Sequence, residues 1–141
     1  RTLTAIAKEP FSMFGSDGVG HDTQSAGSRP DLTHPRSYGA APRFLDRLAK
    51  RTTLLSWEET VKKMTQLPAS RLGIEHTRGL LKKGFFADVV VIDPAVLKDT
   101  ATYSNPYQTP LGIEYVFVNG HLAIEKGNYT GALAGKILRR A

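Results

Sequence analysis

The sequence contains no cysteine and no long run of apolar residues. Without cysteine, the chain has no disulfide, no thiolate nucleophile and no thiolate-rich zinc site. The longest apolar stretch, residues 85–92, is interrupted by Asp88 and is far shorter than the about 20 residues that span a bilayer. The composition therefore predicts no membrane segment, and the absence of cysteine fits a reducing compartment, which predicts a cytoplasmic location.

A long basic run is also missing, although the net charge is +6 and the pI is about 9.7. The lysines and arginines are scattered in short groups, and aromatic residues are not interleaved with them. The sequence therefore predicts no nucleic-acid binding. We interpret the charge as solvated faces and a basic tail, with an acidic substrate or an acidic partner chain as the alternative.

The length of 141 residues and the apolar content of 40% allow one domain with a modest core. This length is too short for a complete (β/α)8 barrel. The first ten residues lack the apolar core and cleavage site of a signal peptide and begin with Arg1 rather than Met. We therefore treat residue 1 as a cut end.

A short apolar segment near the start of the chain predicts a buried strand over Phe11–Gly15, which ends at Ser16-Asp17-Gly18. Asp17 would then lie at the C-terminal end of a strand. Residues 19–41 are rich in Gly, Ser, Asp, Thr and Pro and predict a long loop, of the kind that is usually functional or disordered. An apolar stripe that begins at Pro42 predicts an amphipathic helix to Lys50.

A capping box marks the next helix, because Ser56 is followed three residues later by Glu59. Three residues at helical spacing are expected to pack inward: Trp57, Val61 and Met64. Pro68 predicts an interruption and the start of a second short helix, which ends at Leu72 because Gly73 can take the left-handed conformation.

The last part of the chain has the pattern of a small β-unit. Phe86 and residues 89–92 are aromatic or β-branched and lie between two breakers, Gly84 and Pro94, which predicts a strand. Asn119-Gly120 lies between two apolar stretches and predicts a two-residue type I′ hairpin. A single parallel-type strand and a two-stranded hairpin are both marginal alone, so we expect them to need strands that this sequence does not contain.

Four ordered stretches carry a resemblance to a known family. Residues 84–93, GFFADVVVID, are similar to the segment with which amidohydrolase-superfamily chains enter their small β-sandwich, and residues 116–121 are similar to the closing strand pair. Residues 34–39, HPRSYG, followed by residues 42–45, PRFL, resemble a stretch of the D-aminoacylases. With Ser-Asp-Gly before them, these stretches resemble the C-terminal part of the N-acyl-D-amino-acid deacylase (D-aminoacylase) family.

The resemblance implies an α/β fold in two parts. Residues 1–78 would hold the last strand, the active-site loop and the following helices of a metal-dependent (β/α)8 barrel, and residues 79–141 would form a β-sandwich portion with a C-terminal hairpin. The implied reaction is zinc-dependent hydrolysis of the N-acyl amide bond of an N-acyl-D-amino acid. The zinc ligands would come mostly from an N-terminal portion that this sequence lacks. We therefore expect the chain to be active only with an N-terminal amidohydrolase chain or fragment as its partner.

The same resemblance implies two charged site residues. Asp17 would be the catalytic group that moves a proton from water to the leaving amine, and it would also be a metal ligand. The alternative is an ordinary turn aspartate before Gly18. Arg36 would bind the α-carboxylate of the substrate in a bidentate fork, and the alternative is a surface ion pair with Asp31.

His34 and Tyr38 are the remaining substrate-binding candidates. His34 invites interpretation as a metal ligand, but the implied histidine ligands precede this sequence, so we favour a role in ordering the loop. Tyr38 could cover the pocket, although we favour a role in stapling the loop. The other histidines, His21, His76 and His121, lack metal-ligand spacing and are expected to be exposed or packed side chains.

Two other functions remain open at the level of the sequence. A cyclic-amide hydrolase of the dihydroorotase or hydantoinase type would share the terminal β-unit but not residues 34–43. A non-catalytic structural or binding remnant would keep Asp17 and Arg36 only as relics. Zinc that co-purifies with the assembly would distinguish an enzyme from such a remnant.

Overall fold

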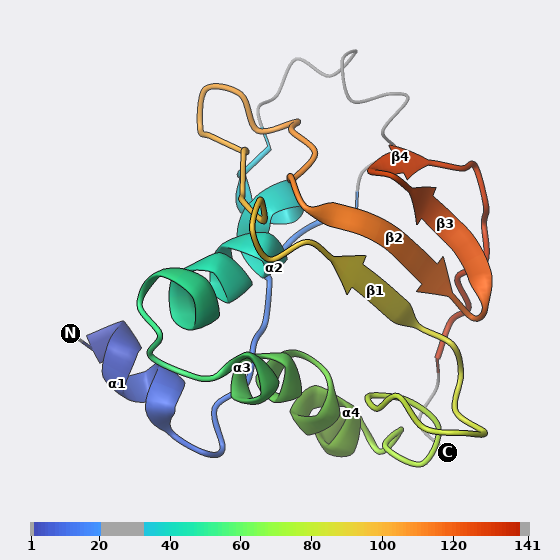
Figure 1. The fold of residues 1–141 in the computed structure, drawn as a ribbon. Coiled ribbons are helices and arrows are strands. Elements are labelled where there is room, and N and C mark those ends of the chain that lie inside the picture. Colours follow the sequence, from blue (N-terminus) through green and yellow to red (C-terminus); the bar gives the residue numbers. More distant parts are fainter. Residues whose placement is uncertain (1, 21–32, 139–141) are drawn as a thin grey trace.

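The computed structural model describes residues 2–20 and 33–138 and places the helices on one side of a small sheet (Figure 1). The helical elements are α1 (Thr2–Lys8), α2 (Arg36–Leu45), the π-helical stretch η2 (Asp46–Arg51), α3 (Trp57–Met64) and α4 (Gln66–Leu72). The strands are β1 (Val89–Ile92), β2 (Ile113–Val118), β3 (His121–Glu125) and β4 (Asn128–Tyr129). No helix in the described part of the chain is long and apolar enough to cross a membrane.

The sheet is antiparallel throughout, with the strand order β1-β2-β3-β4. The turn between β2 and β3 has positive φ angles at Asn119 (50°) and Gly120 (83°), as a type I′ turn requires. The predicted hairpin is therefore confirmed. The expectation that this hairpin needs strands from outside the sequence is wrong, because β1 pairs with β2 and β4 pairs with β3.

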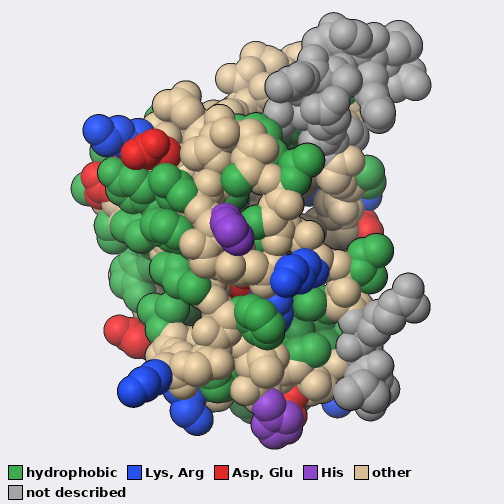
Figure 2. Space-filling view, turned by 90° about the vertical axis from the view of Figure 1, so that its right-hand side faces the viewer, with side chains coloured by type: hydrophobic (Ala, Val, Ile, Leu, Met, Phe, Trp, Pro, Cys, Tyr) green, Lys and Arg blue, Asp and Glu red, His purple; other side chains and the backbone are tan. Residues whose placement is uncertain are grey.

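The core lies among the helices and the β1–β2 connection (residues 93–112) rather than under the sheet. The buried apolar residues are Leu45, Leu48, Ala49, Leu55, Ala69, Leu97 and Ala101. None of the strand residues is fully buried, and Val90 and Val91 are exposed. Seen from the side of β3 and β4, hydrophobic side chains gather in a broad band on the surface (Figure 2). A sheet usually has one face packed on a core, so this sheet lacks a covering layer within the described residues.

The strand predicted over Phe11–Gly15 is wrong. Residues 11–20 form no helix or strand after the turn that follows α1. The Phe14 N–H donates to the Lys63 carbonyl at 3.0 Å, and the Phe14 ring packs on Phe44 with the ring centroids 4.9 Å apart. A buried parallel strand needs neighbours on both sides, and the described residues place no strand next to this segment.

The predicted start of a helix at Pro42 is also wrong, because α2 begins at Arg36 and shortens the predicted loop over residues 19–41. Pro42 lies inside α2, which continues into η2. The buried face of α2 consists of Gly39, Pro42 and Leu45. The N-terminal half of α2 shows no apolar pattern in the sequence. Its buried position is Gly39, whose backbone packs against the side chain of Asp99.

The capping box at the start of α3 is confirmed. The Ser56 hydroxyl accepts a hydrogen bond from the Glu59 N–H at 3.1 Å, and the Glu59 carboxylate accepts one from the Ser56 N–H at 3.1 Å. The backbone N–H of Glu58, and then the Ser56 hydroxyl, lower the pKa of the Glu58 carboxyl group. The first turn of α3 is therefore stabilised by side chains close to it in sequence.

The end of the helical region follows the prediction, with two corrections in its interior. Gly73 ends α4 with φ 73°, as predicted, whereas the break before α4 occurs at Thr65 rather than at Pro68. Val61 is 42% exposed, so the expectation that it packs inward is wrong. The buried positions of α3 are Thr60 and Lys63, whose polar atoms find carbonyl acceptors.

Candidate functional site

Asp17 lies in a tight turn that packs against the start of α2. Its φ of 48° is in the left-handed region, which non-glycine residues adopt rarely and more often at functional sites. The Ser16 hydroxyl accepts a hydrogen bond from the Gly18 N–H at 3.2 Å, and the Ser37 hydroxyl accepts one from the Val19 N–H at 3.2 Å. These bonds fix the turn of residues 16–19, which we call the Asp17 turn, beside α2.

Arg36 reaches across to this turn. Its Nη2 lies 2.9 Å from Oδ2 of Asp17, with 83% of the aspartate side chain and 43% of the arginine side chain exposed. The alternative partner Asp31 lies outside the described residues. The two charged residues that the family resemblance selected are thus neighbours, although the pair is open to solvent and contributes little to stability.

His34 lies at the same end of α2 and contacts the backbone of Arg36. Its Nδ1 accepts a hydrogen bond from the Arg36 N–H at 3.0 Å. The N-cap residue of α2 is Pro35, which has no side chain that can accept such a bond. His34 therefore satisfies a backbone donor at the helix start that would otherwise lack an acceptor.

Tyr38 lies in the first turn of α2 and packs against the β1–β2 connection. Its ring meets the ring of Tyr107 edge-on, with the centroids 5.7 Å apart and an interplanar angle of 81°. This arrangement resembles the predicted staple. The roles of Tyr38 and His34 toward a substrate remain predictions.

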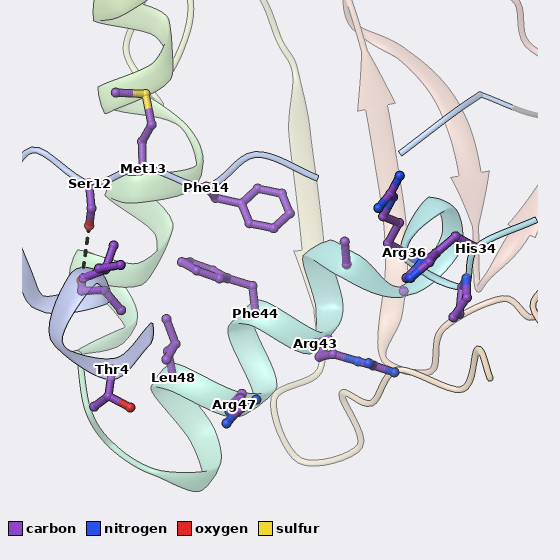
Figure 3. Close-up of a pocket in the computed structure, with 15 residues that line it drawn as sticks. Thr4, Ser12, Met13, Phe14, His34, Arg36, Arg43, Phe44, Arg47 and Leu48 are labelled. Atoms are coloured by element: carbon purple, nitrogen blue, oxygen red, sulfur yellow. Dashed lines mark hydrogen bonds between the residues drawn. The ribbon is translucent and has the colours of Figure 1, made fainter. Parts of the chain in front are cut away.

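A largely apolar pocket of about 360 Å³ lies between α1, residues 12–14 and α2. Figure 3 shows the rings of Phe14 and Phe44 facing each other in this pocket, whereas His34 and Arg36 lie at the far end of α2. Exposed hydrophobic side chains continue along the same segment at Phe11 and Val19. An exposed apolar groove of this kind is typical of a surface that another part of a protein covers.

Sequence reasoning missed two residues that hold the site in place. Lys63 is buried, and its Nζ donates to the carbonyl oxygens of Glu9 (2.6 Å) and Ser12 (3.1 Å), close before the Asp17 turn. The Asp99 side chain is 6% exposed and accepts a hydrogen bond from Nε of Arg43 at 2.6 Å. Lys63 lies more than fifty positions from Ser12, and Asp99 lies more than fifty positions from Arg43, so no local sequence pattern reveals these contacts.

The described residues do not form a metal site by themselves. They contain no group of three or more His, Cys, Asp or Glu side chains that could hold a metal ion. Asp17 is a single exposed carboxylate paired with Arg36, whereas zinc in proteins is held by three or four ligands. His76 and His121 are both exposed, and His21 lies outside the described residues.

The arrangement at the start of α2 combines a proton acceptor with an anion-binding group. An exposed carboxylate such as Asp17 can accept a proton, and a guanidinium can bind another carboxylate bidentately. Asp17 and Arg36 lie in separate segments that the fold brings to one surface. The structure therefore places a carboxylate and a guanidinium side by side on one exposed surface, and their roles toward a substrate stay predictions.

Curated proteins similar to this chain are deacylases of N-acyl-D-amino acids. The chain is 43% identical to a D-aminoacylase of Alcaligenes xylosoxydans xylosoxydans over 129 residues, which are 92% of this chain and 25% of that protein. It is 39% identical to an N-acyl-D-aspartate deacylase of the same organism over 92% of this chain and 24% of that protein. The chain thus spans about a quarter of the length of these relatives.

Solved structures similar to this chain also include a D-aminoacylase and an N-acyl-D-amino-acid deacylase. A D-aminoacylase studied for its binuclear metal centre matches with a TM-score of 0.83 and 37% identity, over 98% of this chain and 27% of that one. An N-acyl-D-glutamate deacylase from Bordetella bronchiseptica, complexed with zinc and a phosphonate inhibitor, matches with a TM-score of 0.73 and 36% identity, over 86% of this chain and 24% of that one.

The family model named Amidohydrolase family matches residues 16–124, from the Asp17 turn to β3. This range contains all four stretches on which the resemblance in the sequence depends. The match covers more than half of the chain and agrees with the structural neighbours. The chain belongs to the amidohydrolase family.

Proposed function

We propose that this chain is the C-terminal portion of a zinc-dependent amidohydrolase that hydrolyses the N-acyl amide bond of N-acyl-D-amino acids. The observation that carries the proposal is the 2.9 Å contact between Asp17 and Arg36, within a chain whose relatives are named deacylases of such substrates. Residues 1–78 would complete a (β/α)8 barrel and residues 79–141 a β-sandwich.

Arg36 would bind the α-carboxylate of the substrate. A guanidinium offers two parallel N–H groups to a carboxylate, which fixes orientation as well as position. With the α-carboxylate fixed, one enantiomer directs its acyl amide toward the reacting groups and the other directs it away. The Arg36 side chain is 43% exposed, so a carboxylate from solution can reach its guanidinium.

Asp17 would carry the proton of the reaction. Water attacks the acyl carbon, its proton passes to the Asp17 carboxylate, and the same proton is delivered to the amide nitrogen as the C–N bond breaks. The products are a carboxylic acid and a free D-amino acid. Activation of the attacking water and polarisation of the carbonyl are the chemistry that bound zinc supplies in such enzymes, and we assign them to the portion that precedes this chain.

The need for that portion is supported by the surface of the chain. Phe11 is 75% exposed, Val19 is also exposed, and the apolar pocket lies between α1, residues 12–14 and α2. The sheet has no buried strand residue. We propose that an N-terminal portion, either joined to this chain or supplied as a separate polypeptide, covers these surfaces and contributes most of the metal ligands, with Asp17 as a further ligand.

The test is to complete the enzyme and measure its activity. This chain replaces the matching quarter of the Alcaligenes D-aminoacylase, and we refer to the product as the complete enzyme. With zinc bound, we expect it to release D-amino acids from N-acyl-D-amino acids and to leave the L-enantiomers intact, whereas the N-terminal portion alone should be inactive.

The controls separate failure to fold from failure of the proposal. Cooperative unfolding and the zinc content establish that the complete enzyme has assembled. An assembled, zinc-loaded enzyme without deacylase activity would identify this chain as a non-catalytic remnant. Opening of a cyclic amide such as a hydantoin, in place of deacylation, would favour the other reaction class of the superfamily.

A further inference from the structure

The β1–β2 connection lies against the N-terminal end of α2, where the candidate site residues begin (Figure 1). Three pairs of residues make the contacts: Tyr103 with His34, Tyr107 with Tyr38, and Asp99 with Arg43. The connection belongs to the part of the chain that builds the sheet, whereas α2 carries Arg36. This part of the fold therefore touches the proposed substrate-binding segment at several points.

The connection is fixed to α2 at Asp99. The carboxylate accepts hydrogen bonds from Nε of Arg43 at 2.6 Å and from the Ala101 N–H at 2.9 Å. A Cβ atom at Gly39 would come within 2.0 Å of Oδ1 of Asp99, so the backbone of α2 approaches this side chain as closely as a glycine allows. The position of Tyr103, four residues later, is therefore set relative to α2.

Tyr103 continues this contact to the backbone of Arg36 through His34. The Tyr103 hydroxyl lies 3.2 Å from Nε2 of His34, and the two rings meet edge-on with their centroids 5.1 Å apart. On the other side of the imidazole, Nδ1 accepts the Arg36 N–H. An accepting Nδ1 carries no proton, so neutral His34 has its proton on Nε2 and donates it to the Tyr103 hydroxyl.

We propose that Tyr103 is a positioning residue for substrate binding, which acts on Arg36 through His34. The inference deepens the proposed function and rests on it. The Tyr103 hydroxyl holds the ring orientation of His34 by accepting from Nε2, and His34 then holds the first N–H of α2. With this turn fixed, the Arg36 side chain starts from one backbone conformation, and less freedom is lost when it binds a carboxylate.

A purely structural role does not account for this contact. Tyr103 is 71% exposed, so its ring buries little apolar surface and contributes little to the free energy of unfolding. Among the described residues, its ring and its hydroxyl both contact His34. The effect of removing the hydroxyl should therefore appear in substrate binding rather than in stability.

The test compares two substrates in the complete enzyme and its Tyr103→Phe variant. One substrate is an N-acyl-D-amino acid, and the other is the matching N-acyl amine, which lacks the α-carboxylate. For the N-acyl-D-amino acid, we expect KM to rise roughly 3- to 10-fold with kcat nearly unchanged, the size expected for one hydrogen bond in uniform binding. For the N-acyl amine, we expect no change, because Arg36 has no carboxylate to bind.

Two further variants make the test specific. Tyr129→Phe is the matched control, because the Tyr129 hydroxyl donates to the Ala132 carbonyl on the β4 side and touches no site residue. Its kinetics should equal those of the unmodified enzyme. In a His34→Gln background, the Tyr103→Phe change should have no further effect on KM, because the proposed coupling passes through His34.

The outcomes separate the inference from the proposed function. If the unmodified complete enzyme hydrolyses N-acyl-D-amino acids while Tyr103→Phe behaves like Tyr129→Phe, the positioning role is wrong and the proposed function stands. Equal losses with both substrates would also overturn it, since they would indicate a general structural effect. If the assembled enzyme hydrolyses neither substrate, the proposed function fails and the inference fails with it.

Discussion

Arg36 and Asp17 belong to one candidate site but are held in different ways. Arg36 begins α2, whose buried face packs on Asp99 and whose first turn is held by His34. Asp17 lies in residues 11–20, which form no helix or strand and expose Phe11. The segment before Asp17 is held mainly by the buried Lys63, whose ammonium group binds backbone carbonyls.

This difference indicates which part of the site is stabilised within this chain and which part depends on a covering surface. The arginine side is organised by contacts within the chain, so its geometry is a property of this sequence. The aspartate side depends on a segment whose apolar residues are exposed, and such a segment gains its final stability when another surface covers it. The changes below disturb the two sides separately in the complete enzyme.

The largest effect is expected from Arg36→Ala. Loss of the guanidinium should lower kcat/KM for N-acyl-D-amino acids by roughly 10- to 100-fold, since hydrogen bonds to charged groups contribute about 1.5–3 kcal/mol. Most of the loss should appear in KM, measured by steady-state kinetics. Arg71→Ala, at an exposed position of α4, is the control. Equal kinetics in both variants would contradict a substrate-binding role.

Lys63→Met should disturb the aspartate side alone. The change leaves the carbonyl groups of Glu9 and Ser12 without their buried donor and should lower the free energy of unfolding by about 1–3 kcal/mol. We expect kcat to fall while KM for the carboxylate substrate is kept. Lys62→Met, at the exposed neighbouring position, is the matched control. A rise in KM without a fall in kcat would show that the two sides are not separate.

Gly39→Ala should disturb the arginine side alone. The added methyl group must displace Asp99, and overpacking of this kind costs about 1–3 kcal/mol, offset in part because alanine favours a helix. We expect a higher KM and an unchanged kcat. Gly135→Ala, where a Cβ atom would meet nothing within 4 Å, is the control. If KM and kcat equal those of the control, the contact between Asp99 and α2 does not position Arg36.

The smallest effect is expected from Ser56→Ala, which removes the cap at the start of α3. Among the described residues, Ser56 makes no contact with Asp17 or Arg36. Loss of an N-cap side chain costs about 1 kcal/mol, so thermal unfolding should shift to a lower temperature. The same change removes one of the bonds that lower the pKa of Glu58. Neither KM nor kcat should change. A kinetic effect would mean that α3 is coupled to the site more tightly than the contacts indicate.

The parts of the fold that the sequence predicted are those set by neighbouring residues. Ser56 and Glu59 lie three residues apart, and Asn119-Gly120 needs only its own positive φ angles, so both features could be recognised from local chemistry. The family resemblance likewise selected Asp17 and Arg36, which the structure brings into contact. Their predicted roles await the experiments proposed above.

The parts that could not be predicted depend on distant contacts. The segment at Phe11 has the composition of a strand, but a strand forms only beside a neighbour. The start of α2 depends on a glycine packed against Asp99, and His34 meets Tyr103 across 69 positions of sequence. Lysine is usually a surface residue. Lys63 is nevertheless buried, because its ammonium group donates hydrogen bonds to three oxygens in the segment before Asp17.

The most direct test of the account is the Asp17→Asn variant of the complete enzyme, with zinc content measured alongside the kinetics. The amide keeps the size of the side chain but cannot take up the proton. We predict that kcat falls by roughly 10²- to 10⁴-fold, the contribution typical of general acid–base catalysis, with KM changed only a few-fold. A zinc-loaded Asp17→Asn enzyme that keeps its full kcat would contradict the central claim that this chain supplies the catalytic carboxylate.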